Sequence, residues 1–124
     1  MTEILLIDDM AGVRRAVTAM LKRAGHTVTT AENGEQGLEL LKARRFDLVI
    51  TDMLMPGSDG ADVLGYLDGQ PNRPRVIAIS GGGAGLSAES ALRLARIKAD
   101  AFLEKPFDNE ALLAAIDKLL VRAA

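Results

Sequence analysis

The amino-acid sequence predicts an α/β fold, in which a doubly wound parallel sheet is covered by helices on both faces. Short runs rich in Leu, Ile and Val alternate with longer segments whose apolar residues recur at helical spacing, and this unit occurs five times. Parallel strands need crossover connections, which the intervening helices supply. Apolar runs separated by helices therefore indicate a sheet that is buried on both sides.

The five strands are expected where a short apolar or β-branched run ends at a polar or turn residue. The first run reads ILLI and is followed by two aspartates, and the third reads FDLVIT and ends at Asp52. The fourth reads RVIAI and ends at Ser80. The expected strands cover residues 4–7, 26–30, 46–51, 75–79 and 99–103.

The five helices follow from apolar spacing and from capping residues. The first has apolar residues at helical spacing and a natural stop at Gly25. Asn33, Asp59 and Ser87 are suitable N-caps for the second, third and fourth helices. The last helix follows Pro106. In doubly wound folds of this kind, the functional site lies at the carboxyl ends of the strands.

Length and composition restrict the function. The chain has 124 residues, the size of one domain, so residues 1–124 are expected to form a single unit. Its net charge of -2 argues against nucleic acid as a main partner. No run approaches the roughly 18 apolar residues of a membrane span, and the acidic N-terminus is unlike a signal peptide. With no cysteine present, a cytoplasmic protein is expected.

Polar residues that suit one chemistry follow the predicted strands. Asp8 and Asp9 follow the first, Asp52 the third and Ser80 the fourth, and Lys105 comes after the fifth. A parallel sheet would gather them at one edge, where the carboxylates repel one another unless a cation neutralises them. Oxygen ligands with access to water suit Mg²⁺ or Mn²⁺. A carboxylate beside such a cation can attack an activated phosphoryl donor.

Four motifs occur in order after the expected strands: I-L-L-I-D-D-M, D-M-L-M-P-G-S-D-G, A-I-S and F-L-E-K-P-F. Together they resemble the receiver domain of two-component response regulators, of the stand-alone type found among chemotaxis regulators. The resemblance implies a flavodoxin-like sheet of order 2-1-3-4-5 with five helices. It also implies a phosphorylation-dependent switch that catalyses only its own phosphorylation and dephosphorylation, and is otherwise no enzyme.

The resemblance assigns roles to individual residues. Asp52 would be the phosphoacceptor. Asp9 would bind the metal directly and Asp8 chiefly through water, with the backbone carbonyl of Leu54 as a further ligand. Lys105 would contact the carboxylate or phosphoryl oxygens.

Two further positions would form the switch. Ser80 would move toward the phosphoryl group. Phe102 occupies the switch-aromatic position, where Tyr is commoner, so a hydroxyl contact is unavailable. Leu54 and Gly82 stand where polar side chains often influence the attacking water, which affects the expected lifetime of the phosphoryl group.

The expected partners are a histidine kinase or histidine phosphotransfer protein as donor, and a target protein that binds the face of helix 4, strand 5 and helix 5. No nucleic acid or membrane contact is expected, and the protein would be a monomer or weak dimer. A phosphate sink or shuttle in a relay, and a degenerate receiver used for docking, are alternatives. A phosphatase with a nucleophilic aspartate would usually have a second aspartate where Leu54 stands, so the sequence argues against that class of enzyme.

Overall fold

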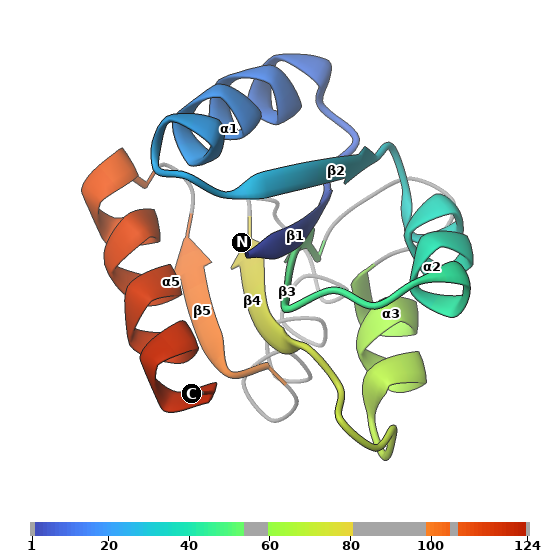
Figure 1. Cartoon of the computed structure of the whole chain (residues 1–124). Helices are drawn as coiled ribbons and strands as arrows, with labels where there is room; N and C mark the ends of the chain where they lie inside the picture. The colour runs from blue at the N-terminus through green and yellow to red at the C-terminus, as the bar shows by residue number, and fades with distance from the viewer. Residues whose placement is uncertain (1, 54–59, 81–98, 105–106, 124) are drawn as a thin grey trace.

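The structure is a computed structural model of the chain and describes residues 2–53, 60–80, 99–104 and 107–123 (Figure 1). Within these ranges there are five strands and four helices. The strands are β1 (Glu3–Ile7), β2 (Thr27–Ala31), β3 (Leu48–Asp52), β4 (Arg75–Ser80) and β5 (Ala101–Glu104). The helices are α1 (Ala11–Arg23), α2 (Gly34–Ala43), α3 (Gly60–Leu67) and α5 (Asn109–Ala123).

All strand pairs are parallel, and the sheet has the order β2-β1-β3-β4-β5. The predicted fold class and strand order are therefore confirmed. Helices α1 and α5 lie on one side of the sheet, and α2 and α3 lie on the other (Figure 1). The helix predicted after Ser87, and the cap predicted at Asp59, fall outside the described residues.

The side chains of the central strands alternate between two apolar cores. Leu5, Ile7 and Val49 belong to the core with Val63 and Leu64 of α3. The intervening positions pack on the opposite face, against buried residues of α1 and α5. This second core consists of Ile4, Leu6, Val17, Met20, Leu21, Leu48, Ile50, Ile77, Ile79, Leu112, Ile116 and Leu119. Both faces are thus covered, as the apolar runs predict.

Four strand starts differ from the prediction by one or two residues, and the first strand begins at Glu3 rather than at residue 4. The second strand starts at Thr27, because His26 is still bonded to the end of α1 through its N–H and the carbonyl of Leu21. The third starts at Leu48 and includes Asp52 itself. The fifth starts at Ala101, and the carboxylate of the preceding Asp100 accepts a hydrogen bond of 2.8 Å from the N–H of Val76.

Helix α2 begins at the cap that its sequence predicts, and it packs closely on the sheet at a glycine. The Asn33 side chain accepts a hydrogen bond of 2.8 Å from the N–H of Gln36, which confirms the cap. The Gln36 side chain in turn accepts one of 2.9 Å from the N–H of Glu32. Gly37 lies directly over Ile7 of β1, so that a Cβ atom at this position would collide with the isoleucine side chain. The helix therefore approaches the sheet closely.

Among the described helices, none has both the length and the apolar character that a bilayer crossing demands.

Candidate metal centre

Three aspartates lie at the carboxyl edge of the sheet. Asp8 and Asp9 directly follow β1, and Asp52 is the last residue of the adjacent strand β3. Asp8 is 1% exposed and Asp52 is 4% exposed, whereas Asp9 is open to solvent. The β1–β3 pairing explains this placement, because Ile7 pairs with Thr51 and the next residues of both strands reach the same edge.

The three carboxylates converge. Each offers an oxygen atom, and these oxygens all lie within 4.8 Å of one another. Opposite ligands of an octahedral Mg²⁺ ion would be about 4.2 Å apart, since each Mg–O distance is about 2.1 Å. Hard, anionic oxygen donors at this spacing fit Mg²⁺ or Mn²⁺ with water completing the shell. The cluster that the sequence predicts is therefore formed.

The backbone around Asp8 is fixed by three hydrogen bonds. The N–H of Asp8 donates to the carbonyl of Ala31 at 3.1 Å, and the N–H of Met10 donates to Oδ1 of Asp8 at 2.9 Å. Arg14 donates from its guanidinium to the carbonyl of Asp8 at 2.7 Å. The bond from Met10 orients a buried carboxylate that would otherwise be costly to desolvate, and the other two fix the backbone that carries it.

Asp52 is held against the neighbouring strand β4. It pairs with Ile79 in the sheet register, and the N–H of the following Met53 donates to the Ile79 carbonyl at 2.8 Å. The Thr51 hydroxyl is fully buried and donates to the Asp52 carbonyl at 3.1 Å. The strand is therefore anchored on both sides of Asp52, which limits movement of the backbone that carries this carboxylate.

The other predicted site residues are described to different extents. Ser80 is the last residue of β4, at the same edge of the sheet, and pairs with Glu104 of β5. Phe102 of β5 is half-buried against the core beneath α2 and α3, while Ala101 and Leu103 pack on the opposite face, as their alternation predicts. Leu54 and Lys105 lie outside the described residues.

Arg14 is a site residue that sequence reasoning missed. Besides its bond to the Asp8 carbonyl, its guanidinium lies 3.8 Å from the carboxylate of Glu32, and its side chain is only 17% exposed. The weak signal in the sequence was its place in the helix just after the acidic pair. Sequence spacing does not show that a side chain of this helix reaches back to the end of the strand.

A five-stranded parallel sheet with a carboxylate cluster at its carboxyl edge is the arrangement that the resemblance to the signalling modules of two-component systems implies. Residues 4–117 match the response regulator receiver domain, and the chain belongs to that family. It is therefore a phosphorylation-dependent switch of the two-component type.

Particular relatives extend this finding. The transcriptional regulatory protein GlrR of Escherichia coli (strain K12) is 34% identical over 98% of this chain and 27% of its own length. The transcriptional regulatory protein CpxR of the same organism is 35% identical over 99% of this chain and 51% of its own length. The chain thus spans about a quarter and about half of these two relatives.

A solved structure is similar over nearly the whole of both chains. The response regulator TrrA of Thermotoga maritima, crystallised in complex with Mg²⁺-BeF, is 31% identical with a TM-score of 0.81. The similarity covers 96% of this chain and 99% of that one.

Proposed function

We propose that Asp52 accepts a phosphoryl group from a phosphohistidine on a histidine kinase or histidine phosphotransfer protein, in the presence of Mg²⁺ or Mn²⁺. The observation that supports this most directly is the convergence of the carboxylates of Asp8, Asp9 and Asp52 within 4.8 Å at the carboxyl edge of the sheet. A cluster of like charges is costly without a cation, and a cation is what phosphoryl transfer requires.

In the proposed transfer, an oxygen of Asp52 forms a bond to phosphorus. The bond between phosphorus and the donor imidazole nitrogen breaks, and its electron pair stays on that nitrogen. A bound divalent cation would neutralise the charge on the phosphoryl oxygens. Burial of Asp52 limits competing hydration of the attacking carboxylate, and the flanking strand bonds hold it in place.

The remaining residues have supporting roles in this proposal. Asp9, which is exposed, would bind the cation directly, and the buried Asp8 chiefly through water, together with the backbone carbonyl of Leu54. Lys105 would supply a second positive charge beside the phosphoryl oxygens.

The switch would connect Asp52 to the far edge of the sheet. Ser80 would hydrogen-bond the phosphoryl group, and Phe102 would change its packing in response. Phosphorylation would then shift the equilibrium between two conformations of the surface made by the predicted fourth helix, β5 and α5. This surface would bind a target protein.

We place this module in the cytoplasm, with residues 1–124 acting as one receiver unit. It would be a monomer or weak dimer and would turn over no separate substrate.

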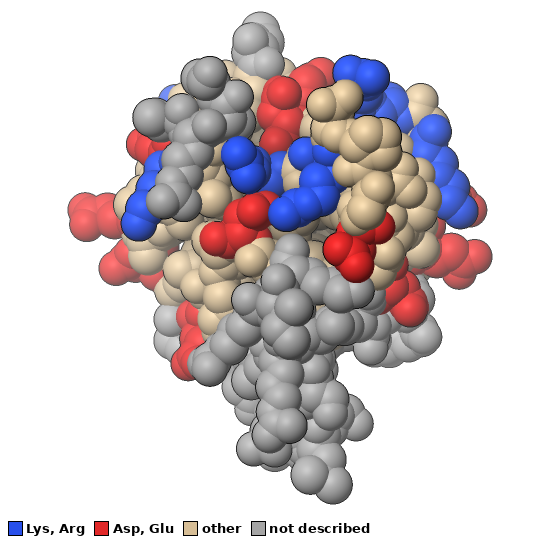
Figure 2. All heavy atoms as spheres, turned by 90° about the horizontal axis from the view of Figure 1, so that it is seen from below, with Lys and Arg blue, Asp and Glu red and all other residues tan. Residues whose placement is uncertain are grey.

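On the face shown in Figure 2, the Lys and Arg side chains lie among Asp and Glu side chains and do not form a patch of one sign. Nucleic-acid binding by this module is therefore not proposed, because it needs concentrated positive charge.

The test is incubation with acetyl phosphate and MgCl₂, followed by intact-protein mass spectrometry. We expect one added phosphoryl group in the wild type and in Asp117→Asn, a control at an exposed aspartate of α5. We expect none in Asp52→Asn, or in the wild type with EDTA. Full labelling of Asp52→Asn would reject the acceptor assignment, and an unmodified wild type would favour a degenerate docking module.

A further inference from the structure

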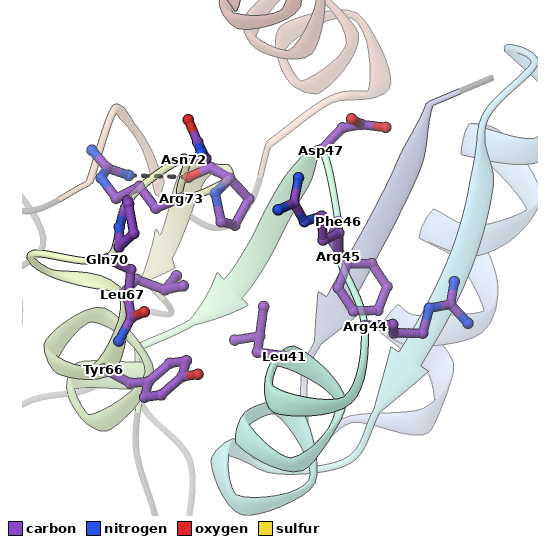
Figure 3. A pocket seen from close by; sticks show the side chains of 12 residues that line it. Leu41, Arg44, Arg45, Phe46, Asp47, Tyr66, Leu67, Gln70, Asn72 and Arg73 are labelled. Atoms are coloured by element: carbon purple, nitrogen blue, oxygen red, sulfur yellow. Dashed lines mark hydrogen bonds between the residues drawn. The ribbon is translucent and has the colours of Figure 1, made fainter.

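A separate hollow lies at the other end of the strands. It has a volume of about 320 Å³ and is lined by the segment that joins α2 to β3 and the segment that joins α3 to β4 (Figure 3). Asp47, the residue before β3, lines it and Asp52 ends β3, so about 16 Å of extended chain separates the hollow from the carboxylate cluster. The hollow is therefore no part of the metal centre.

The apolar floor of the hollow belongs to the core. Phe46 is 7% exposed and Leu67 is 4% exposed, and both are members of the core cluster beneath α2 and α3. Leu41 packs against the same cluster from the end of α2. A floor built from core side chains keeps its shape, so an apolar group placed on it would meet a preformed surface.

Most of the charged groups around the hollow are already engaged. Arg73 makes two hydrogen bonds to the Asp100 carboxylate, at 3.1 and 3.2 Å. The Arg44 guanidinium stacks on the Phe46 ring and lies 3.5 Å from a carboxylate oxygen of Glu3. The Asp47 carboxylate accepts a hydrogen bond of 2.8 Å from the N–H of Glu3.

Arg45 differs from these neighbours. Within the described part of the chain, its guanidinium has no hydrogen-bond or ion-pair partner. Figure 3 shows it directed to the side of β3 where the hollow lies, whereas Arg44 points away. The hollow therefore presents one uncommitted positive charge beside an apolar floor.

Neutral polar groups complete the lining. The Tyr66 hydroxyl and the side-chain amides of Gln70 and Asn72 have no hydrogen-bond partner among the residues that the structure describes. Asn72 has a φ of 56°, in the left-handed region, and is the only described residue other than glycine with a positive φ. Preceded by Pro71, it forms a turn that holds its amide at the rim. Amide groups of this kind can both donate to and accept from a peptide backbone.

We propose that this hollow docks an acidic segment of a partner protein. One carboxylate of the segment pairs with Arg45, a neighbouring apolar side chain lies on the Phe46–Leu67 floor, and Gln70 and Asn72 bind its backbone. A single free guanidinium matches one carboxylate and is too little charge for a polyphosphate ligand. Because the hollow and the carboxylate cluster are at opposite edges of the sheet, both can be occupied together.

The test uses an acetylated, amidated pentapeptide with one phenylalanine between two pairs of glutamates. Its binding to the ¹⁵N-labelled wild-type protein is followed by amide chemical shifts. We expect saturable shifts in the segments around Arg45 and Asn72, and at least fivefold weaker binding to Arg45→Gln. Arg15→Gln, a control that removes an exposed arginine of α1, should bind as the wild type does. Beryllofluoride with MgCl₂ should change the affinity less than twofold.

Other results would overturn the proposal. Equal weakening by Arg45→Gln and Arg15→Gln would mean general charge attraction. Unchanged affinity when the phenylalanine is replaced by alanine would mean that the floor is not used. Absence of saturable shifts, or equal affinity for phenylacetate and the peptide, would also reject an acidic protein segment as the occupant. None of these results depends on whether Asp52 is phosphorylated.

Discussion

Replacing Asp9 by asparagine should stabilise the metal-free protein, although it removes a site residue. An Asp9 oxygen lies within 4.8 Å of oxygens of Asp8 and Asp52. Two unit charges at that distance repel by about 0.9 kcal/mol in water and about 3.5 kcal/mol at the effective dielectric of a protein surface. Asp9 stays next to Asp8 in the unfolded chain, so the repulsion between these two residues is similar in both states. The substitution therefore changes the free energy of unfolding mainly by removing the repulsion between Asp9 and Asp52. Since Asp9 is exposed, we expect a gain of about 1–2 kcal/mol.

Magnesium should reduce or reverse this advantage. At a concentration of 100 times its Kd, a ligand stabilises the folded protein by about 2.7 kcal/mol. If Asp9→Asn binds Mg²⁺ tenfold more weakly, the variant gains only about 1.4 kcal/mol at that concentration. The variant's lead over the wild type should therefore shrink by about 1.3 kcal/mol or more.

The assay is urea unfolding followed by circular dichroism, in EDTA and in MgCl₂ at matched ionic strength. Asp117→Asn is the control, because it removes an exposed aspartate of α5 that is not a member of the cluster. It should change stability by less than about 0.5 kcal/mol and keep the full magnesium effect. If Asp9→Asn were less stable than the wild type in EDTA, or equally stabilised by Mg²⁺, the electrostatic reasoning would be refuted.

Three structural predictions can be checked by the same unfolding assay. Gly37→Ala should destabilise the protein by about 1 kcal/mol, because the new Cβ collides with a buried isoleucine of β1 and this cost outweighs the gain in helix propensity. Gly65→Ala should instead stabilise the protein, because the space around Gly65 is open. Asp100→Ala should cost about 2–3 kcal/mol, since its carboxylate accepts from the N–H of Val76 at 2.8 Å and pairs with an arginine, whereas Asp100→Asn should cost less. Asn33→Ala should cost about 1 kcal/mol and Asn33→Asp almost nothing, as both Asn and Asp cap helices. Equal stability of the paired variants would contradict each of these.

The sequence alone predicted the sheet and the carboxylate cluster at its edge. Buried parallel strands are read from apolar runs, and their connections must be crossovers. Once the strands run parallel, residues that follow adjacent strands meet at one edge. The convergence of Asp8 and Asp9 with Asp52 therefore follows from the strand order, without knowledge of any side-chain contact. The Asn33 cap was predicted from local sequence, because Asn is a preferred residue directly before a helix.

Only the tertiary structure decided which distant side chains contact one another. Arg14 reaches the Asp8 carbonyl because α1 turns back over the end of β1. Asp100, just before β5, accepts from Val76 because the start of β5 lies beside the start of β4. The hollow beside Arg45 exists because the segments after α2 and α3 end next to each other. The spacing of apolar residues along the sequence shows which face of a single helix or strand is buried. Contacts between elements depend on how closely they pack and on how their side chains turn, and these are set by the whole assembled core.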